Sequence, residues 1–305
     1  MGASWLRTGR GPRRPPKGVE APPPSQPAAG ALRGRTASSN VSEVTEILGI
    51  REYLAEYVGT ALLLLVGLSA VCADFAVRSP VVSALHDTSL RRLLTGIIFA
   101  GAITAIVYSP LGRRSGAHLN PAVTLAFWLL GKITSLSAVF YAVAQLAGAL
   151  TGAALVLAIW GGWATNVHVG ATVPEDGGWL AALTAETAMT FLLVSLILNF
   201  VDRPHLTAFT GAAVGILVAF FVFVEAPVSG ASLNPARTLG PAVVGGTFTD
   251  LWVYLVGPPL GALSAALLYR HRRSSVACAR LYHPDTVACR FMDCQHKRRH
   301  HTDAG

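Results

Sequence analysis

The sequence predicts an all-α integral membrane protein in which six transmembrane helices and two re-entrant half-helices form an inverted repeat. Three observations lead to this prediction. The chain of 305 residues is 52% hydrophobic and only 13% charged, whereas about a quarter of the residues in an ordinary soluble domain are charged. Its middle contains six apolar segments long enough to cross a bilayer, and one short motif occurs twice. A soluble enzyme of this size is therefore disfavoured.

The distribution of charge divides the chain into three parts. Residues 51–270 contain 20 of the 40 charged side chains, and the two tails contain the other 20. We expect a membrane-embedded domain over residues 51–270, with repeat halves at about 51–160 and 179–270. Residues 1–50 are predicted to be a disordered, basic, proline-rich arm, and residues 271–305 a solvated, basic cytoplasmic tail. The net charge of +8 lies mainly in these flanks, so nucleic acid is not an expected partner.

The six apolar segments set the topology. A helix of about 20 residues spans about 30 Å of hydrocarbon, and an even number of crossings puts both termini on one side of the bilayer. Twenty Lys and Arg residues then lie on the side of the termini and three on the other. The positive-inside rule therefore predicts cytoplasmic termini, and Arg237 belongs to neither set. The segments lie at about residues 53–76, 92–108, 135–160, 179–200, 207–226 and 251–269.

An internal repeat relates the two halves of the chain. Residues 115–125 (SGAHLNPAVTL) and 229–239 (SGASLNPARTL) are identical at 9 of 11 positions. A second similarity places Glu56 in the first segment and Glu186 in the fourth, each followed by Thr four residues later. Because each half contains three crossings, the second copy is inserted upside down relative to the first, which gives an inverted repeat.

The repeated motif predicts two half-helices that meet inside the membrane. Asn is a favoured N-cap and Pro a favoured first helical residue, and the apolar stretch after the first motif ends near Gly131, after about 16 Å of helix. Two such helices entering from opposite faces present their positive N-terminal ends near the midplane. That field opposes protons and cations and admits neutral molecules. The residues that form these ends are Asn120, Pro121, Ala122, Asn234, Pro235 and Ala236.

With these motifs the chain resembles the aquaporin, or major intrinsic protein, family. The two Asn-Pro-Ala motifs, the Glu-x-x-x-Thr of each half, and Arg237 three residues after the second Asn match the family over about residues 51–270. The resemblance implies a lipid-embedded homotetramer in the plasma membrane with one pore in each subunit. It also implies a passive channel for water and small neutral solutes, with no catalytic residues and no cofactor.

The resemblance further implies a narrow outer constriction that contains Arg237. The other filter positions fall on Val222, Ala231 and either Phe99 or Ala100. Water-selective members typically have His at the position of Val222, so valine predicts a wider, more apolar constriction. Such a filter suits glycerol, urea, ammonia or uncharged metalloid hydroxides, as in the glycerol-conducting and nodulin-like branches. Phe99 at the pore would narrow the opening towards water, and a strictly water-selective channel is the alternative.

Three further polar residues have two interpretations each. By the resemblance, Glu56 and Glu186 support the carbonyl groups of the two re-entrant loops. The competing interpretation is a proton-coupling carboxylate in a secondary transporter, a class that also uses inverted repeats. His118 either anchors its loop or faces the pore, or it is a packing residue.

The C-terminal tail contains possible metal ligands. Cys289, Cys294, His296, His300 and His301 occur close together, but their spacing fits no common zinc pattern. The sequence therefore predicts no metal site.

Overall fold

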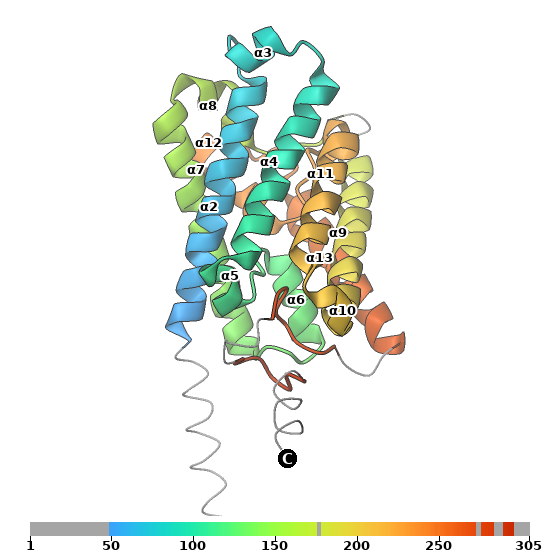
Figure 1. Cartoon of the computed structure of the whole chain (residues 1–305). Coiled ribbons are helices and arrows are strands. Elements are labelled where there is room, and N and C mark those ends of the chain that lie inside the picture. The colour runs from blue at the N-terminus through green and yellow to red at the C-terminus, as the bar shows by residue number, and fades with distance from the viewer. Residues whose placement is uncertain (1–48, 176–177, 273–275, 284–288, 296–305) are drawn as a thin grey trace, which may run out of the picture. The chain divides into compact units, whose positions relative to one another are not determined.

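The computed structural model describes residues 49–175, 178–272, 276–283 and 289–295. Every regular element among these residues is a helix, and six helices are long and apolar enough to cross a bilayer. They agree with the predicted segments to within four residues at either end, which confirms the fold class. The six are α2 (Ile50–Phe75), α4 (Thr88–Tyr108), α7 (Ser135–Trp160), α9 (Gly178–Asp202), α11 (Thr210–Ser229) and α13 (Leu251–Arg272) (Figure 1).

Two shorter helices occupy the places predicted for the half-helices. Helix α6 (Pro121–Leu129) and helix α12 (Pro235–Gly245) begin directly after Asn120 and Asn234. From these starts α6 runs towards the end of the bundle where α2 begins, and α12 runs towards the opposite end (Figure 1). The two copies of the motif therefore enter the bundle from opposite ends, as an inverted repeat requires.

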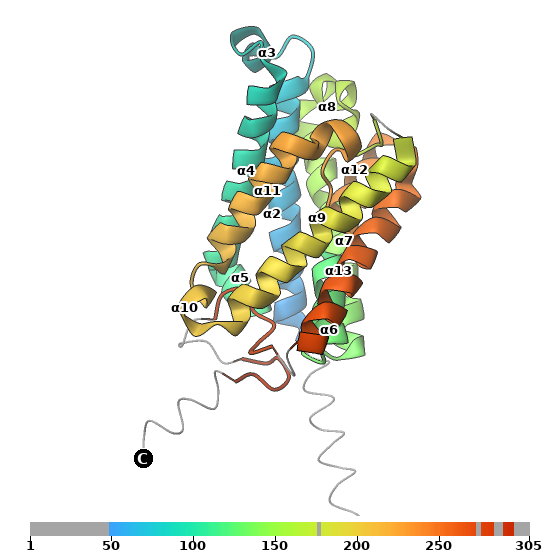
Figure 2. The same cartoon turned by 90° about the vertical axis from the view of Figure 1, so that its right-hand side faces the viewer.

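The helices pack in the same pairs in the two halves. In the first half α2 packs against α4 and α7, and in the second half α9 packs against α11 and α13. Each half-helix packs against a long helix of the other half: α6 packs against α13, and α12 packs against α7. Figure 2 shows α11, α9 and α13 from the side of the second half. The two halves are therefore interlocked at the centre of the bundle.

Two equivalent glycines allow the closest helix pairs to form. A Cβ atom on Gly148 of α7 would collide with the carbonyl oxygen of Tyr57 in α2. A Cβ atom on Gly261 of α13 would collide with the carbonyl oxygen of Thr187 in α9. Close approach of backbones through small residues is the usual way in which helices associate in lipid, and both halves use it at the same place.

Short elements connect the long helices at the two ends of the bundle. Those near the start of α2 include α5 (Pro110–Ser115) and α10 (Pro204–Thr207), and those at the other end include α3 (Pro80–Ala84), α8 (Gly162–Asn166) and η1 (His168–Gly170) (Figure 1).

The tail differs from its prediction. We use the name docked tail for its described residues, 276–283 and 289–295, which lie at the end of the bundle near α5 and α6 (Figure 1). Residues 276–281 are all buried, so the prediction of a solvated tail is wrong for this stretch. The physical reason is its apolar content: Val276, Ala277, Ala279 and Leu281 are 0–7% exposed. The tail as a whole, residues 271–305, contains seven Lys and Arg residues among 35.

Candidate functional site

The site begins at the two half-helix N-termini, where asparagine acts as the cap. The side-chain Oδ1 of Asn120 accepts a hydrogen bond from the backbone N–H of Ala122 at 2.8 Å. Oδ1 of Asn234 accepts one from Ala236 at 2.9 Å. Both asparagines have extended backbone angles and are followed by Pro as the first helical residue. Each cap satisfies one of the N–H groups that a helix start leaves without a partner.

The same two asparagines join the two halves of the chain. Nδ2 of Asn120 donates to the carbonyl oxygen of Leu233 at 2.9 Å, and Nδ2 of Asn234 donates to that of Leu119 at 2.9 Å. Asn120 and Asn234 are 6% and 7% exposed. Because a primary amide has two N–H donors, each side chain retains one donor for a molecule at the centre of the bundle.

The loops that lead to the two caps have the same unusual backbone. Ala117 and Leu119 precede Asn120 with φ of 55° and 51°, and Ala231 and Leu233 precede Asn234 with φ of 50° and 57°. Left-handed conformations cost an L-residue about 1–2 kcal/mol each. Such strained backbone persists where the surroundings over-determine it, typically at functional sites.

Glu56 and Glu186 hold these strained loops in place. Oε1 and Oε2 of Glu56 accept hydrogen bonds from the backbone N–H groups of His118 and Leu119 at 3.1 and 2.7 Å. The oxygens of Glu186 accept from those of Ser232 and Leu233, both at 2.7 Å. Both glutamates are 0% exposed. The contact is to the amide N–H groups, whereas the sequence predicts support of the carbonyl groups.

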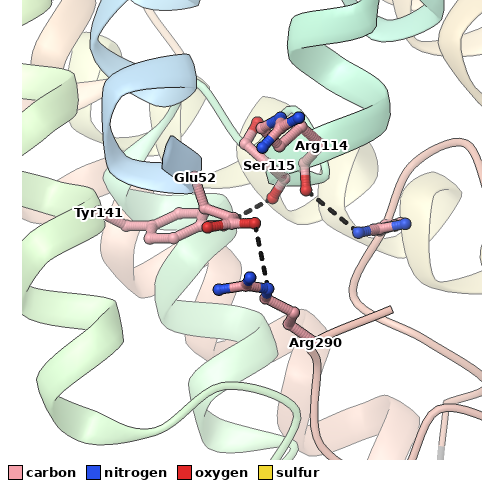
Figure 3. A network of polar contacts seen from close by, with 6 residues as sticks. Glu52, Arg114, Ser115, Tyr141 and Arg290 are labelled. Atoms are coloured by element: carbon pink, nitrogen blue, oxygen red, sulfur yellow. Dashed lines mark hydrogen bonds and ion pairs between the residues drawn. The ribbon is translucent and has the colours of Figure 1, made fainter. Parts of the chain in front are cut away.

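A second equivalent pair, which the sequence does not predict, anchors the start of each loop. The hydroxyl of Tyr141 in α7 donates to the carbonyl oxygen of Ser115 at 2.7 Å (Figure 3). The hydroxyl of Tyr254 in α13 donates to that of Ser229 at 2.7 Å. The signal that would have found them is the repeat itself, since each tyrosine lies in the last long helix of its half.

A cavity of about 380 Å³ passes along both motifs, and four of the five predicted filter residues line it. Phe99, Val222, Ala231 and Arg237 line this cavity, whereas Ala100 lines a separate groove between α4 and α11. Helix phase explains the difference, because consecutive residues of a helix point about 100° apart.

Two contacts position the side chain of Arg237 in this cavity. Nη1 of Arg237 donates to the carbonyl oxygen of Gly170 at 2.8 Å. Its guanidinium carbon lies 5.6 Å from the centre of the Phe99 ring, within the range of a cation–π contact. Arg237 is 8% exposed. A guanidinium has five N–H donors, so the bond to Gly170 leaves donors for a solute.

His118 both lines the cavity and contacts the tail. Its ring stacks between those of Phe127 and Phe291, with centroids 4.9 and 5.7 Å away. Nδ1 lies 3.1 Å from Oγ1 of Thr124, and Nε2 lies 2.8 Å from the carbonyl oxygen of Ala279. The ring therefore joins the first re-entrant loop to the docked tail.

The predicted tail residues fall into two groups. His296, His300 and His301 lie outside the described residues. Cys289 and Cys294 lie close to two further possible ligands, Cys278 and His283.

Comparisons with known proteins agree with this geometry. The sequence profile of the family described as Major intrinsic protein matches residues 43–269. Aquaporin NIP1-3 of Oryza sativa subsp. japonica is 35% identical over 239 residues, which cover 77% of this chain and 78% of that protein. Glycerol uptake facilitator protein-like 6 of Lactiplantibacillus plantarum is 35% identical over 230 residues, covering 72% and 97%. The X-ray structure of the aquaglyceroporin from Plasmodium falciparum has a similar fold, with a TM-score of 0.62 and 24% identity over 72% of this chain and 95% of that one.

Proposed function

The chain belongs to the major intrinsic protein family and is a passive channel for water and small solutes, not an enzyme; from this premise we propose which residues select the solute. The observation that carries the proposal is that four residues from three separate parts of the sequence line one cavity beside the two motifs. The selective constriction consists of Phe99, Val222, Ala231 and Arg237.

The chemistry of this constriction favours a small uncharged solute with O–H or N–H groups. Phe99, Val222 and Ala231 offer an apolar wall, and Arg237 offers N–H donors from a fixed position. Glycerol, urea, ammonia and uncharged metalloid hydroxides meet these requirements. Arg237 also repels cations, because its charge lies at a narrow, poorly solvated point.

The centre of the channel excludes protons by a second mechanism. Asn120 and Asn234 each have an N–H available beside a positive helix N-terminus. A water molecule that accepts both donors has its oxygen lone pairs engaged, so it is poorly placed to accept a proton from its neighbour. Neutral molecules pass, and protons and other cations do not.

A strictly water-selective channel is the second candidate, because one observation favours it. Phe99, and not the small Ala100, lines the cavity, and an aromatic ring narrows the opening. The two candidates differ in the size of solute that they admit. They share the passive mechanism and the arrangement of the motifs.

A permeability panel on one preparation of proteoliposomes separates the two candidates. Stopped-flow light scattering would measure water, glycerol, urea, ammonia and arsenous acid flux, with protein-free liposomes as the control. We expect water flux with a weak temperature dependence and glycerol flux well above the control. Glycerol and urea flux equal to the control would favour the water-selective channel.

We also propose that the channel is a homotetramer in the plasma membrane with both termini in the cytoplasm. The support for the topology is the placement of 20 basic residues on the side of the termini against three on the other. The support for assembly is the family. Reporter fusions at each terminus test the topology, and light scattering of the detergent-solubilised protein tests the subunit number.

A further inference from the structure

The docked tail packs on the first re-entrant loop. The backbone N–H of Leu281 donates to the carbonyl oxygen of Gly116 at 3.1 Å. The carbonyl oxygen of Ala279 lies 2.8 Å from Nε2 of His118. Both contacts are to the loop that leads to the first asparagine cap, which lines the cavity. We use the name mouth for the end of the cavity on the side of the bundle where the docked tail lies (Figure 1).

Two arginines of the docked tail add polar contacts to the membrane domain, and Figure 3 shows the one between Arg290 and Glu52. Nη2 of Arg280 donates to the carbonyl oxygen of Arg114 at 3.2 Å, and Nε of Arg290 lies 3.5 Å from Oε1 of Glu52 at the start of α2. Arg280 is 1% exposed. Both described stretches of the tail are thus attached to the membrane domain.

Three cysteines and a histidine converge inside the docked tail. Their ligand atoms, the Sγ atoms of Cys278, Cys289 and Cys294 and a ring nitrogen of His283, all lie within 4.8 Å of one another. Sγ of Cys278 is 3.4 Å from Sγ of Cys289, and Sγ of Cys294 is 3.4 Å from Nε2 of His283. Ligands of a tetrahedral zinc ion, at about 2.3 Å for sulfur and about 2.0 Å for nitrogen, lie about 3.5 to 3.8 Å apart.

A metal explains this cluster better than a disulfide does. The Sγ atoms of Cys278 and Cys289 are 3.4 Å apart, whereas a disulfide bond is about 2.05 Å long. A disulfide would also involve only two of the four ligand atoms that lie within 4.8 Å of one another. Three thiolates and one imidazole are a donor set of structural zinc sites, and thiolate ligands select zinc over magnesium or calcium.

A bound metal ion would stabilise the folded conformation of the docked tail. Its described residues form neither helix nor strand, and yet its three cysteines are 1–4% exposed. Segments without regular structure normally run over the protein surface. A structural zinc ion contributes folding free energy directly, and so it would stabilise a buried segment of this kind. The family profile ends at residue 269, so the cluster lies outside the family's shared domain.

We propose that Cys278, His283, Cys289 and Cys294 bind one structural zinc ion, which holds Leu281 at the mouth of the channel. Leu281 lies between the first two ligands, is 3% exposed, and lines the same cavity as Asn120 and Val214. Loss of the ion frees this side chain and widens the mouth. The metal site stands on its own geometry, whereas the effect on flux rests on the proposed pathway through the cavity.

Metal content of the purified full-length protein tests the site. Elemental analysis should give about one zinc ion per chain, and Co²⁺ in its place should show the intense visible absorption of a tetrahedral thiolate site. Cys294→Ser and His283→Ala should lose the zinc, whereas His283→Cys, which keeps four ligands, should retain it. Cys72→Ser is the matched control, because Cys72 is a buried cysteine of α2; it should keep one zinc. Gel filtration of each variant verifies that the membrane domain remains folded.

Permeability tests the second half of the proposal. Cys294→Ser in proteoliposomes, and wild type treated with a zinc chelator, should both conduct water severalfold faster than untreated wild type. Leu281→Ala should conduct equally fast while it retains zinc.

The metal site and its effect on flux would be overturned by different results. The metal site would be overturned if the wild-type protein lacked stoichiometric zinc, or if Cys294→Ser and His283→Ala kept it. A disulfide between Cys278 and Cys289, detected as resistance of both thiols to alkylation, would also overturn it. Zinc present with Leu281→Ala flux equal to wild type would overturn the effect at the mouth. If neither wild type nor any variant conducts, both the proposed pathway and the proposed effect of Leu281 on flux are wrong. The zinc content of the same proteins still tests the metal site.

Discussion

The ring of Phe99 in α4 lies directly against Gly67 of α2, so closely that a Cβ atom on Gly67 would overlap three carbons of the ring. The ring also lines the cavity and lies beside Arg237. Gly67, which has no side chain, therefore determines where the ring of Phe99 lies.

Replacing Gly67 by Ala tests this relationship. The added methyl group forces the ring away from α2 and towards the cavity, so we expect glycerol and water permeability to fall. Overpacking of this kind costs about 1–3 kcal/mol of stability. Gly101→Ala is the control, because a Cβ atom there meets nothing within 4 Å. Equal permeability of the two variants would show that Phe99 does not define the constriction.

Separate substitutions at residues 99 and 100 test which of the two side chains faces the solute. Phe99→Ala removes the ring from the cavity and should raise glycerol permeability severalfold relative to water. Ala100→Val adds volume in the groove between α4 and α11 and should leave both permeabilities unchanged. Vesicle swelling in glycerol provides the measurement, and a larger effect at Ala100 would contradict the assignment.

Arg237→Val should weaken the exclusion of ions. The substitution removes both the charge and the donor that bonds to Gly170, which leaves a wider and neutral constriction. We expect proton leak, measured with a pH-sensitive dye inside the vesicles, to rise while water permeability is retained. Unchanged proton leak with unchanged solute preference would count against a filter role for Arg237.

Glu186→Gln should destabilise the second re-entrant loop. The carboxylate accepts hydrogen bonds from the N–H groups of Ser232 and Leu233 on different oxygens, whereas the amide has one oxygen. One buried N–H then lacks a partner, at a cost of about 1–3 kcal/mol. Thermal unfolding in detergent should show a lower midpoint for this variant. Glu175→Gln, at an exposed carboxylate, should unfold like wild type.

Sequence alone predicts the part of this molecule that has a local or repeated pattern. The six crossings follow from apolar length, and the half-helix starts follow from the N-cap preference of Asn120 and Asn234. The choice between Phe99 and Ala100 does not follow, because it depends on a rotation of α4 that packing against Gly67 determines. The cluster of Cys278 with His283, Cys289 and Cys294 does not follow either, because its spacing has no common precedent. It forms only where the tail folds on the membrane domain.

The paired bonds from Asn120 and Asn234 to the opposite loops also set the kinetic class of the transport. An alternating-access carrier rocks one repeat against the other, and here that motion would break both bonds at once. Because both asparagines line the cavity, the freed groups would bond to water, and the net loss would be about 0.5–1.5 kcal/mol for each bond. We therefore expect a flux that does not saturate through a conformational cycle.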